Sequence, residues 1–223
     1  MRSIIFANGD FNPPTNNLAL AALAAGDLFI AADGGAHHAR ELRKTLDVVI
    51  GDLDSITERL RDALAEQGTE FIVHPRDKDE TDLELALKYA IEQGSEDILL
   101  LGLMGGRLDQ TLANLLLLTR KEWSQVRLLA ADGPDIAVLL KRKDSYKFIV
   151  DPGDTISLIP LSGEVTGVST RGLKWVLEDA TLKFGSTLGV SNEATGEFAW
   201  IEIRSGQLLV VHRAFDESLT ERP

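Results

Sequence analysis

Two aspartates at alternate positions, Asp52 and Asp54, follow an apolar run that stops at Gly51. In an extended segment, residues two apart point the same way, so both carboxylates could hold one hard cation such as Mg²⁺. The same segment also fits a purely structural role. Ser55 and Glu58 have the spacing of a capping box for the next helix, and Asp is common in such turns. The residues at the ends of the other strands in the N-terminal half therefore bear on whether this segment binds a metal or only caps a helix.

Short apolar runs alternate with helical patterns over the first 132 residues. We expect strands at residues 3–7, 27–32, 47–50, 70–73, 97–101 and 126–131, and helices at residues 17–25, 36–44, 57–67, 82–93 and 112–121. Apolar strands that alternate with helices are typical of a parallel sheet covered on both faces. Ligands of such sheets bind beyond the carboxyl ends of the strands.

Four of these strands are followed by glycine or charged residues. The residues expected at this edge of the sheet are Asp33, Gly34, Asp52, Asp54, Lys78, Asp82, Gly105, Gly106, Arg107 and Asp109. Carboxylate oxygens suit Mg²⁺, glycine turns at helix N-termini suit phosphate, and Lys or Arg can neutralise developing charge. The pattern indicates phosphoryl or pyrophosphoryl transfer from a nucleotide.

Composition excludes several other classes of protein. The 223 residues contain no Cys, which rules out disulfides, thiol catalysis and zinc sites built on thiolates. A formal net charge of −12 argues against nucleic acid or an anionic membrane as a partner. The motifs of a P-loop and of a dinucleotide-binding loop are both missing. The N-terminus has the pattern of a first strand and not of a signal peptide, so we expect a cytoplasmic protein.

The pattern changes after about residue 133, where short alternating runs are separated by Gly, Pro, Asp or Ser. We therefore expect an α/β protein in which a parallel-sheet, Rossmann-like domain (residues 1–135) precedes an antiparallel β-sandwich domain (residues 136–223). Loops of the second domain would present Trp175, Ser191 and Asn192. A Trp at such a position either packs in the core or offers its face to a flat or cationic ligand.

Six motifs, taken in order along nearly the whole chain, closely resemble the thiamine pyrophosphokinase (thiamine diphosphokinase) family. They are ADGGA (32–36), GDLDS (51–55), KDETDLELAL (78–87), LGLMGGRLDQTLANL (101–115), GLKW (172–175) and GVSNE (189–193). The resemblance implies an α/β domain followed by a β-sandwich, and a homodimer with shared active sites. It also implies transfer of the β,γ-pyrophosphoryl group of ATP to the thiamine hydroxyl, with release of AMP.

The resemblance also implies roles for individual residues. Mg²⁺ ligands and catalytic carboxylates would be Asp52, Asp54 and Asp82, with Asp109 as a further catalytic carboxylate. Nucleotide contacts would come from Asp33, Gly34, Lys78, Gly105, Gly106, Arg107 and Gln110, and thiamine contacts from Trp175, Ser191 and Asn192. One position departs from the family, because Gln110 stands where a His is usual.

Two alternatives remain open at this point. The same N-terminal scaffold could serve a diphosphokinase for another heterocyclic alcohol, such as a pterin; Trp175, Ser191 and Asn192 favour thiamine. The chain could instead be a non-catalytic sensor of thiamine or a nucleotide, which Gln110 alone suggests, because a Gln cannot move a proton as a His can.

Overall fold

The computed structural model describes residues 1–215; the last residues, 216–223, for most of which the sequence predicts a frayed tail, lie outside this range. The chain divides into two compact units, Met1–Gly133 and Pro134–Pro223. Within the described residues, no helix combines the length and the apolar character that crossing a membrane requires.

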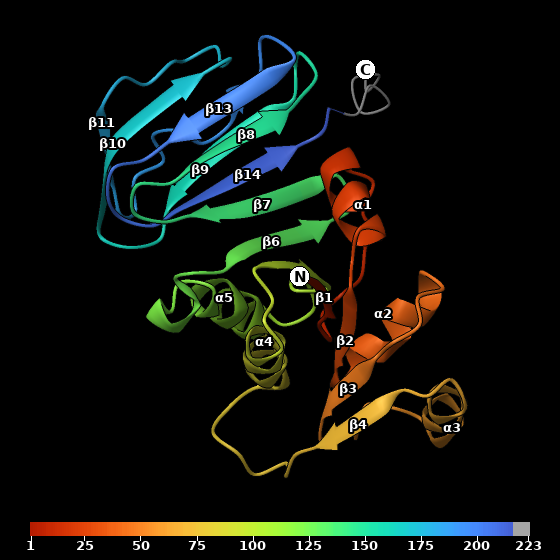
Figure 1. The fold of residues 1–223 in the computed structure, drawn as a ribbon. Coiled ribbons are helices and arrows are strands. Elements are labelled where there is room, and N and C mark those ends of the chain that lie inside the picture. Colours follow the sequence, from red (N-terminus) through yellow and green to blue (C-terminus); the bar gives the residue numbers. More distant parts are fainter. Residues whose placement is uncertain (216–223) are drawn as a thin grey trace. The chain divides into compact units, whose positions relative to one another are not determined.

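The first unit is a parallel sheet with helices on both sides, as predicted. Its strands are β1 (Arg2–Phe6), β2 (Leu28–Ala32), β3 (Val48–Gly51), β4 (Glu70–Val73), β5 (Asp97–Leu101) and β6 (Arg127–Asp132). Its α-helices are α1 (Asn17–Ala24), α2 (Ala36–Glu41), α3 (Glu58–Glu66), α4 (Asp82–Glu92) and α5 (Leu108–Leu117). Helices α2 and α3 lie on one side of this sheet, and α4 and α5 lie on the other (Figure 1).

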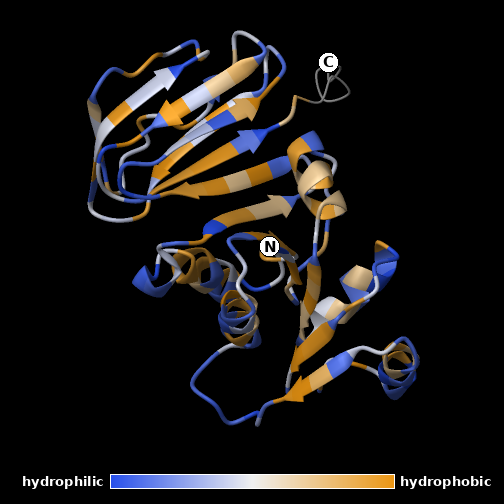
Figure 2. Cartoon of the chain, in the orientation of Figure 1, coloured by the Kyte–Doolittle hydropathy of each residue, from blue (hydrophilic) through white to orange (hydrophobic). Residues whose placement is uncertain are grey.

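The strand order within this unit is β6-β5-β1-β2-β3-β4, and all neighbours are parallel. The chain therefore moves outward from β1 to β4 on one side and then crosses back to place β5 on the other side of β1. Ile4 and Ile5 of β1 and Leu99 and Leu100 of the neighbouring β5 are completely buried, and β1–β3 carry hydrophobic colour in Figure 2. Burial of each such side chain contributes roughly 1.5–3 kcal/mol.

Two local expectations around Asp52 are wrong. The chain after Gly51 is not extended, because Leu53 adopts a left-handed conformation with φ 63° and a turn follows at residues 54 and 55. Helix α3 begins at Glu58 and is capped by Thr57, whose Oγ1 accepts a hydrogen bond from the Leu60 amide at 3.3 Å. Ser55 is therefore not the helix cap. The turn separates it from the helix by two residues.

The helix predicted over residues 112–121 lies four residues nearer the N-terminus, as α5. The two glycines that precede it, Gly105 and Gly106, adopt positive φ angles of 88° and 66° and complete the turn. Helix α5 can therefore begin at Leu108, with Arg107 as its N-cap. As a result, Asp109 and Gln110 belong to its first turn.

The second unit consists of two antiparallel sheets, which confirms the predicted fold class. One sheet has the order β12-β9-β14-β7 and the other β11-β10-β13-β8. The strands are β7 (Asp135–Leu140), β8 (Ser145–Ile149), β9 (Thr155–Pro160), β10 (Glu164–Arg171), β11 (Ala180–Lys183), β12 (Asn192–Glu193), β13 (Phe198–Glu202) and β14 (Leu208–Arg213). The short strands β11 and β12 were not expected from the sequence, since neither shows a clear alternating pattern.

Candidate active site

An acidic cluster, formed by Asp33, Asp52 and Asp82, lies at the carboxyl ends of β2 and β3. One carboxylate oxygen from each residue lies within 4.8 Å of the other two. Asp33 follows β2 directly, Asp52 follows β3, and Asp82 is the first residue of α4. Helix α4 starts there because Thr81 caps it, accepting a hydrogen bond from the Glu84 amide at 3.2 Å, as the sequence predicts.

The acidic cluster contains unsatisfied oxygens. Oδ1 of Asp33 and Oδ1 of Asp82 are buried, and neither accepts a hydrogen bond within the described part of the chain. Nζ of Lys78 lies 2.9 Å from Asp82 Oδ1 and brings a positive charge, although this ion pair does not have the angles of a hydrogen bond. Buried carboxylate oxygens that accept no hydrogen bond are costly, and three carboxylates lie together here, so the cluster fits a hard divalent cation.

The pKa of Asp33 also fits a cation bound at the acidic cluster. Its side chain is buried, and burial raises the pKa of the carboxyl above its ordinary value. Hydrogen bonds from Ser55 and the Gly34 amide lower the pKa, while the negative charges of Asp82 and Asp52 raise it further; the net shift is upward. A cation at this place would reverse the balance, because it favours the ionised carboxylate.

Gly51 makes the close approach of these carboxylates possible. A Cβ atom at this position would lie 2.9 Å from Cβ of Asp33 and 3.1 Å from Cγ of Asp82. Any larger residue would therefore push Asp33 and Asp82 apart. The glycine of the GDLDS motif thus has a packing role, which the sequence alone does not reveal.

Asp54 lies outside the acidic cluster in this structure. Its Oδ2 lies 3.8 Å from Nε of Arg76, and its Oδ1 accepts a hydrogen bond from Ser55 Oγ at 3.2 Å. Its amide donates a hydrogen bond to Asp52 Oδ1 at 3.1 Å, so the two residues are linked through the backbone. The left-handed Leu53 between them turns the Asp54 side chain away. Asp33 takes the place in the cluster that the sequence pattern assigned to Asp54, whose role as a ligand stays a prediction.

A pocket of about 150 Å³ adjoins the acidic cluster. It is lined by Ala7, Asn8, Gly9, Ala32, Thr81, Asp82, Leu83, Gln110, Ala113 and Asn114. The pocket brings Gln110 of α5 beside Asp82 of the cluster. It also includes Asn8, Gly9 and Asn114, which the sequence pattern did not single out. The signal that could have found Asn8 and Gly9 is the segment Asn8-Gly9-Asp10, because β1 is followed by glycine and polar residues just as the other strands are.

Arg107, at the end of the glycine loop, pairs with Asp109 in the first turn of α5. Nη2 of Arg107 donates a hydrogen bond to Asp109 Oδ2 at 2.5 Å, and this bond lowers the pKa of the Asp109 carboxyl. Both side chains are exposed, and Asp109 does not join the acidic cluster. No side chain of the described residues caps α5, so the amides of its first turn remain suited to a phosphate group.

In the second unit, Trp175 and Asn192 lie together. Asn192 is buried; its Nδ2 donates a hydrogen bond to the Trp175 carbonyl at 2.7 Å, and its Oδ1 accepts one from the Trp175 amide at 3.1 Å. The Trp175 side chain is 58% exposed, so it is not a core residue. Ser191 is held in a left-handed conformation, and its amide donates to Ser157 Oγ at 3.0 Å. Asn192 therefore acts as a support that presents the Trp175 ring.

Comparison with known proteins identifies the family. Residues 20–130 match the family described as thiamin pyrophosphokinase, catalytic domain, and residues 142–208 match thiamin pyrophosphokinase, vitamin B1 binding domain. Thiamine pyrophosphokinase of Bacillus subtilis is 30% identical over 162 residues, covering 72% of this chain and 75% of the relative. The chain belongs to the thiamine pyrophosphokinase family.

Other relatives and solved structures agree. Thiamin pyrophosphokinase 1 of Caenorhabditis elegans is 27% identical, covering 82% of this chain and 77% of the relative. The crystal structure of the Bacillus subtilis thiamine pyrophosphokinase superposes with a TM-score of 0.82 at 26% identity, covering 96% of this chain and 99% of that one. The structure of the Geobacillus thermodenitrificans protein gives a TM-score of 0.79 at 25% identity, covering 97% and 99%.

The two family matches fall on different units of the chain. The thiamine pyrophosphokinase catalytic match lies within Met1–Gly133, which contains the acidic cluster and the adjoining pocket. The vitamin B1 binding match lies within Pro134–Pro223, which contains Trp175 and Asn192. The resemblance noted from the six sequence motifs is therefore confirmed at the level of the family.

Proposed function

We propose that this protein is a thiamine pyrophosphokinase that transfers the pyrophosphoryl group of ATP to the hydroxyl of thiamine, giving thiamine diphosphate and AMP. The observation that carries the proposal is the acidic cluster, in which Asp33 and Asp82 each keep a buried carboxylate oxygen that accepts no hydrogen bond from residues 1–215. This cluster lies in the unit that matches the catalytic domain of the family. The donor set suits the metal complex of a nucleoside triphosphate.

Asp33, Asp52 and Asp82 would hold Mg²⁺, with Asp54 as a further carboxylate next to them in the chain. When bound, the cation would neutralise phosphate charge. The protein's own cations would act in the same direction, since Lys78 lies beside Asp82 and the exposed Arg107 is able to turn toward the phosphates when it leaves Asp109. Their charge would stabilise negative charge that develops at the phosphoryl oxygens.

The hydroxyl of thiamine must lose a proton as it attacks, and the site supplies carboxylates for this step. Asp52, Asp54, Asp82 and Asp109 are the candidates that the sequence predicts, and Asp54 and Asp109 lie outside the acidic cluster. A carboxylate that is not a metal ligand can accept a proton, and Asp54 is held by weaker contacts, with the exposed Arg76 at 3.8 Å and the Ser55 hydroxyl at 3.2 Å. We therefore favour Asp54 over the clustered residues for this role.

Thiamine recognition would fall to the second unit. Thiamine carries a thiazolium cation and flat rings, which an exposed indole attracts through its π face. Trp175 offers such a face, its backbone is held by two hydrogen bonds to Asn192, and Ser191 precedes Asn192 in the chain. We propose that two copies of the chain form a homodimer in which the thiamine site of one copy meets the acidic cluster of the other.

The test is to incubate the protein with thiamine, ATP and Mg²⁺ and to identify both products by mass. AMP with thiamine diphosphate would support the proposal, whereas ADP with thiamine monophosphate would show that another phosphorus is attacked. Turnover of a hydroxymethylpterin in place of thiamine would favour the pterin alternative. Tight binding of thiamine and ATP without any product would favour a sensor. For variants of the site residues in the same assay, Asp62→Asn, at an exposed position of α3, serves as the control.

A further inference from the structure

The loops that follow β1 and β5 border the place where the strand order of the first unit reverses. These strands are parallel neighbours, with Phe6 opposite Leu101 at their carboxyl ends. The chain continues from β1 to one side of the sheet and from β5 to the other. A crevice forms at such a point because the two loops diverge, and ligands of open parallel sheets bind there.

Three hydrogen bonds join these two loops. The amides of Ala7 and Gly9 donate to the carbonyls of Leu101 and Gly102, each at 2.8 Å. The third bond alone uses a side chain, because the amide of Gly106 donates to Oδ2 of Asp10 at 2.7 Å. The first two bonds continue the sheet, so the third is the one that holds the far part of the glycine loop.

Asp10 also packs closely on this loop. A Cβ atom at Gly105 would lie 2.4 Å from Cβ of Asp10, and one at Gly106 would lie 3.3 Å from its Oδ1. Both glycines have positive φ. Consecutive glycines lose more conformational freedom on ordering than other residues do, so this loop needs an anchor to keep one shape. The next residue, Arg107, is the N-cap of α5.

We propose that Asp10 is a positioning residue for the nucleotide. By binding the Gly106 amide, it fixes the glycine loop and the start of α5 before the substrate arrives, so that less ordering has to accompany binding. The identity of the ligand rests on the function proposed above, whereas the anchoring contact does not. The role requires a hydrogen-bond acceptor at residue 10. It does not depend on the negative charge of Asp10, since a carboxylate beside a triphosphate is in itself unfavourable.

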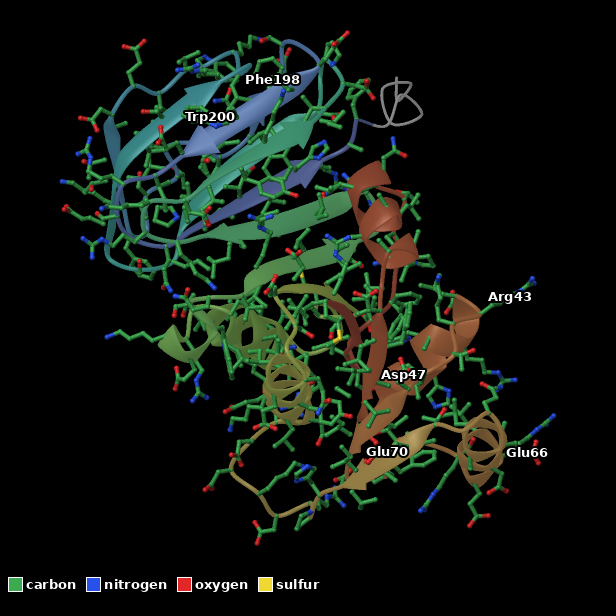
Figure 3. The ribbon with its side chains drawn as sticks, viewed as in Figure 1. Arg43, Asp47, Glu66, Glu70, Phe198 and Trp200 are labelled. Atoms are coloured by element: carbon green, nitrogen blue, oxygen red, sulfur yellow. The ribbon has the colours of Figure 1, made fainter. Side chains whose placement is uncertain are left out.

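The charge and the acceptor can be separated by substitution. Asp10→Ala removes both, while Asp10→Asn keeps a carbonyl oxygen that can accept from the Gly106 amide. The chain offers a matched control in Asp47, an exposed aspartate whose Oδ2 accepts a hydrogen bond from the Phe29 amide, also at 2.7 Å. Asp47, labelled in Figure 3, precedes β3, whereas Asp52 of the acidic cluster follows it, so the two residues lie at opposite ends of this strand.

The experiment has two measurements. Hydrogen exchange of the Gly106 amide is followed by NMR without substrates, and the affinity for ATP with Mg²⁺ is measured by calorimetry, together with the KM values for ATP and thiamine. Losing a charge-assisted hydrogen bond should speed Gly106 exchange in Asp10→Ala about tenfold. The ATP affinity should fall by a similar factor while the thiamine KM stays unchanged. Asp10→Asn should restore both quantities to within about threefold, and Asp47→Ala should change neither.

Several results would overturn the proposal. Unchanged Gly106 exchange in Asp10→Ala would mean that the anchor does not exist in solution. Faster exchange with unchanged or tighter ATP binding would mean that the loop is anchored for another purpose. An equal loss of ATP affinity in Asp47→Ala would reduce the effect to general destabilisation. If wild-type protein binds ATP but forms no product, the proposed function fails, yet exchange and calorimetry still decide the role of Asp10.

Discussion

Replacing Asp33 with Asn should stabilise the protein in the absence of metal. The cluster holds three carboxylate oxygens within 4.8 Å of one another, and Asp33 takes part in two of the three pairs. At an effective dielectric constant of about 20, each pair of charges at this distance repels by roughly 3 kcal/mol. Solvent at the partly exposed Asp52 and Asp82, together with the ammonium of Lys78, offsets most of this repulsion. We expect a net gain of about 1–2 kcal/mol.

The pH dependence should follow the same cause. Burial raises the pKa of Asp33 above its ordinary value of 3.8, so the folded state binds its proton more tightly than the unfolded state does. This contribution to stability is fully present below pH 3.8 and is lost as the pH rises through the folded-state pKa. The metal-free wild type should therefore lose stability over that range, and Asp33→Asn should lose less.

The assay is thermal unfolding with EDTA and with excess MgCl₂, for wild type and Asp33→Asn. For a chain of this length, the expected gain corresponds to a rise in Tm of about 3–6 °C without metal. Mg²⁺ should raise the Tm of the wild type clearly and that of the variant less, because one ligand is missing. A variant that is less stable than the wild type in EDTA, or an equal response of both to Mg²⁺, would refute the reasoning. Asp62→Asn, on the exposed face of α3, controls for a simple change in net charge.

Four further substitutions test other parts of the molecule. Asp54→Asn should lower turnover by orders of magnitude with an unchanged Tm; near-normal kcat would remove Asp54 from the reaction. Trp175→Ala should raise the thiamine KM and spare the ATP KM, and the opposite pattern would contradict its role as a thiamine platform. Asp154→Ala should destabilise the second unit by about 3 kcal/mol in urea unfolding, because it leaves the buried His212 and two amides without their shared acceptor. Gln110→His should add a pKa near neutral pH to the kcat profile if this position can move a proton, and an unaltered profile would limit it to hydrogen bonding.

Much of the first unit can be predicted from the sequence, because strands buried on both faces read as continuous apolar runs. That periodicity by itself places Asp33, Asp52 and Asp82 at one edge of the sheet. Periodicity does not report the backbone of single residues in turns. Leu53 is apolar, and its residue type does not indicate a positive φ, yet this one angle places Asp54 outside the acidic cluster.

Contacts between remote loops were harder still to predict. Asn8 and Asp10 follow a strand just as the other site residues do, but they stand in a segment with two prolines that matches none of the six family motifs. Their partners, Ser55 and Gly106, are 47 and 96 residues away in the chain. Only the strand order, which places β1 beside β5, brings Asp10 to Gly106.

Gln110 bears most directly on which group can take the proton of the attacking hydroxyl. It lines the pocket beside Asp82, where the related sequences are expected to carry His. The side-chain amide of Gln110 does not titrate near neutral pH, so proton transfer in this chain has to rely on carboxylates or on water. Within the acidic cluster, Asp82 is already paired with Lys78, and burial raises the pKa of Asp33, so a bound cation would favour the ionised form of Asp33. Carboxylates that hold a cation are poor candidates for the base, and an exposed neighbour such as Asp54, whose oxygens contact Arg76 and the Ser55 hydroxyl, is better placed for it.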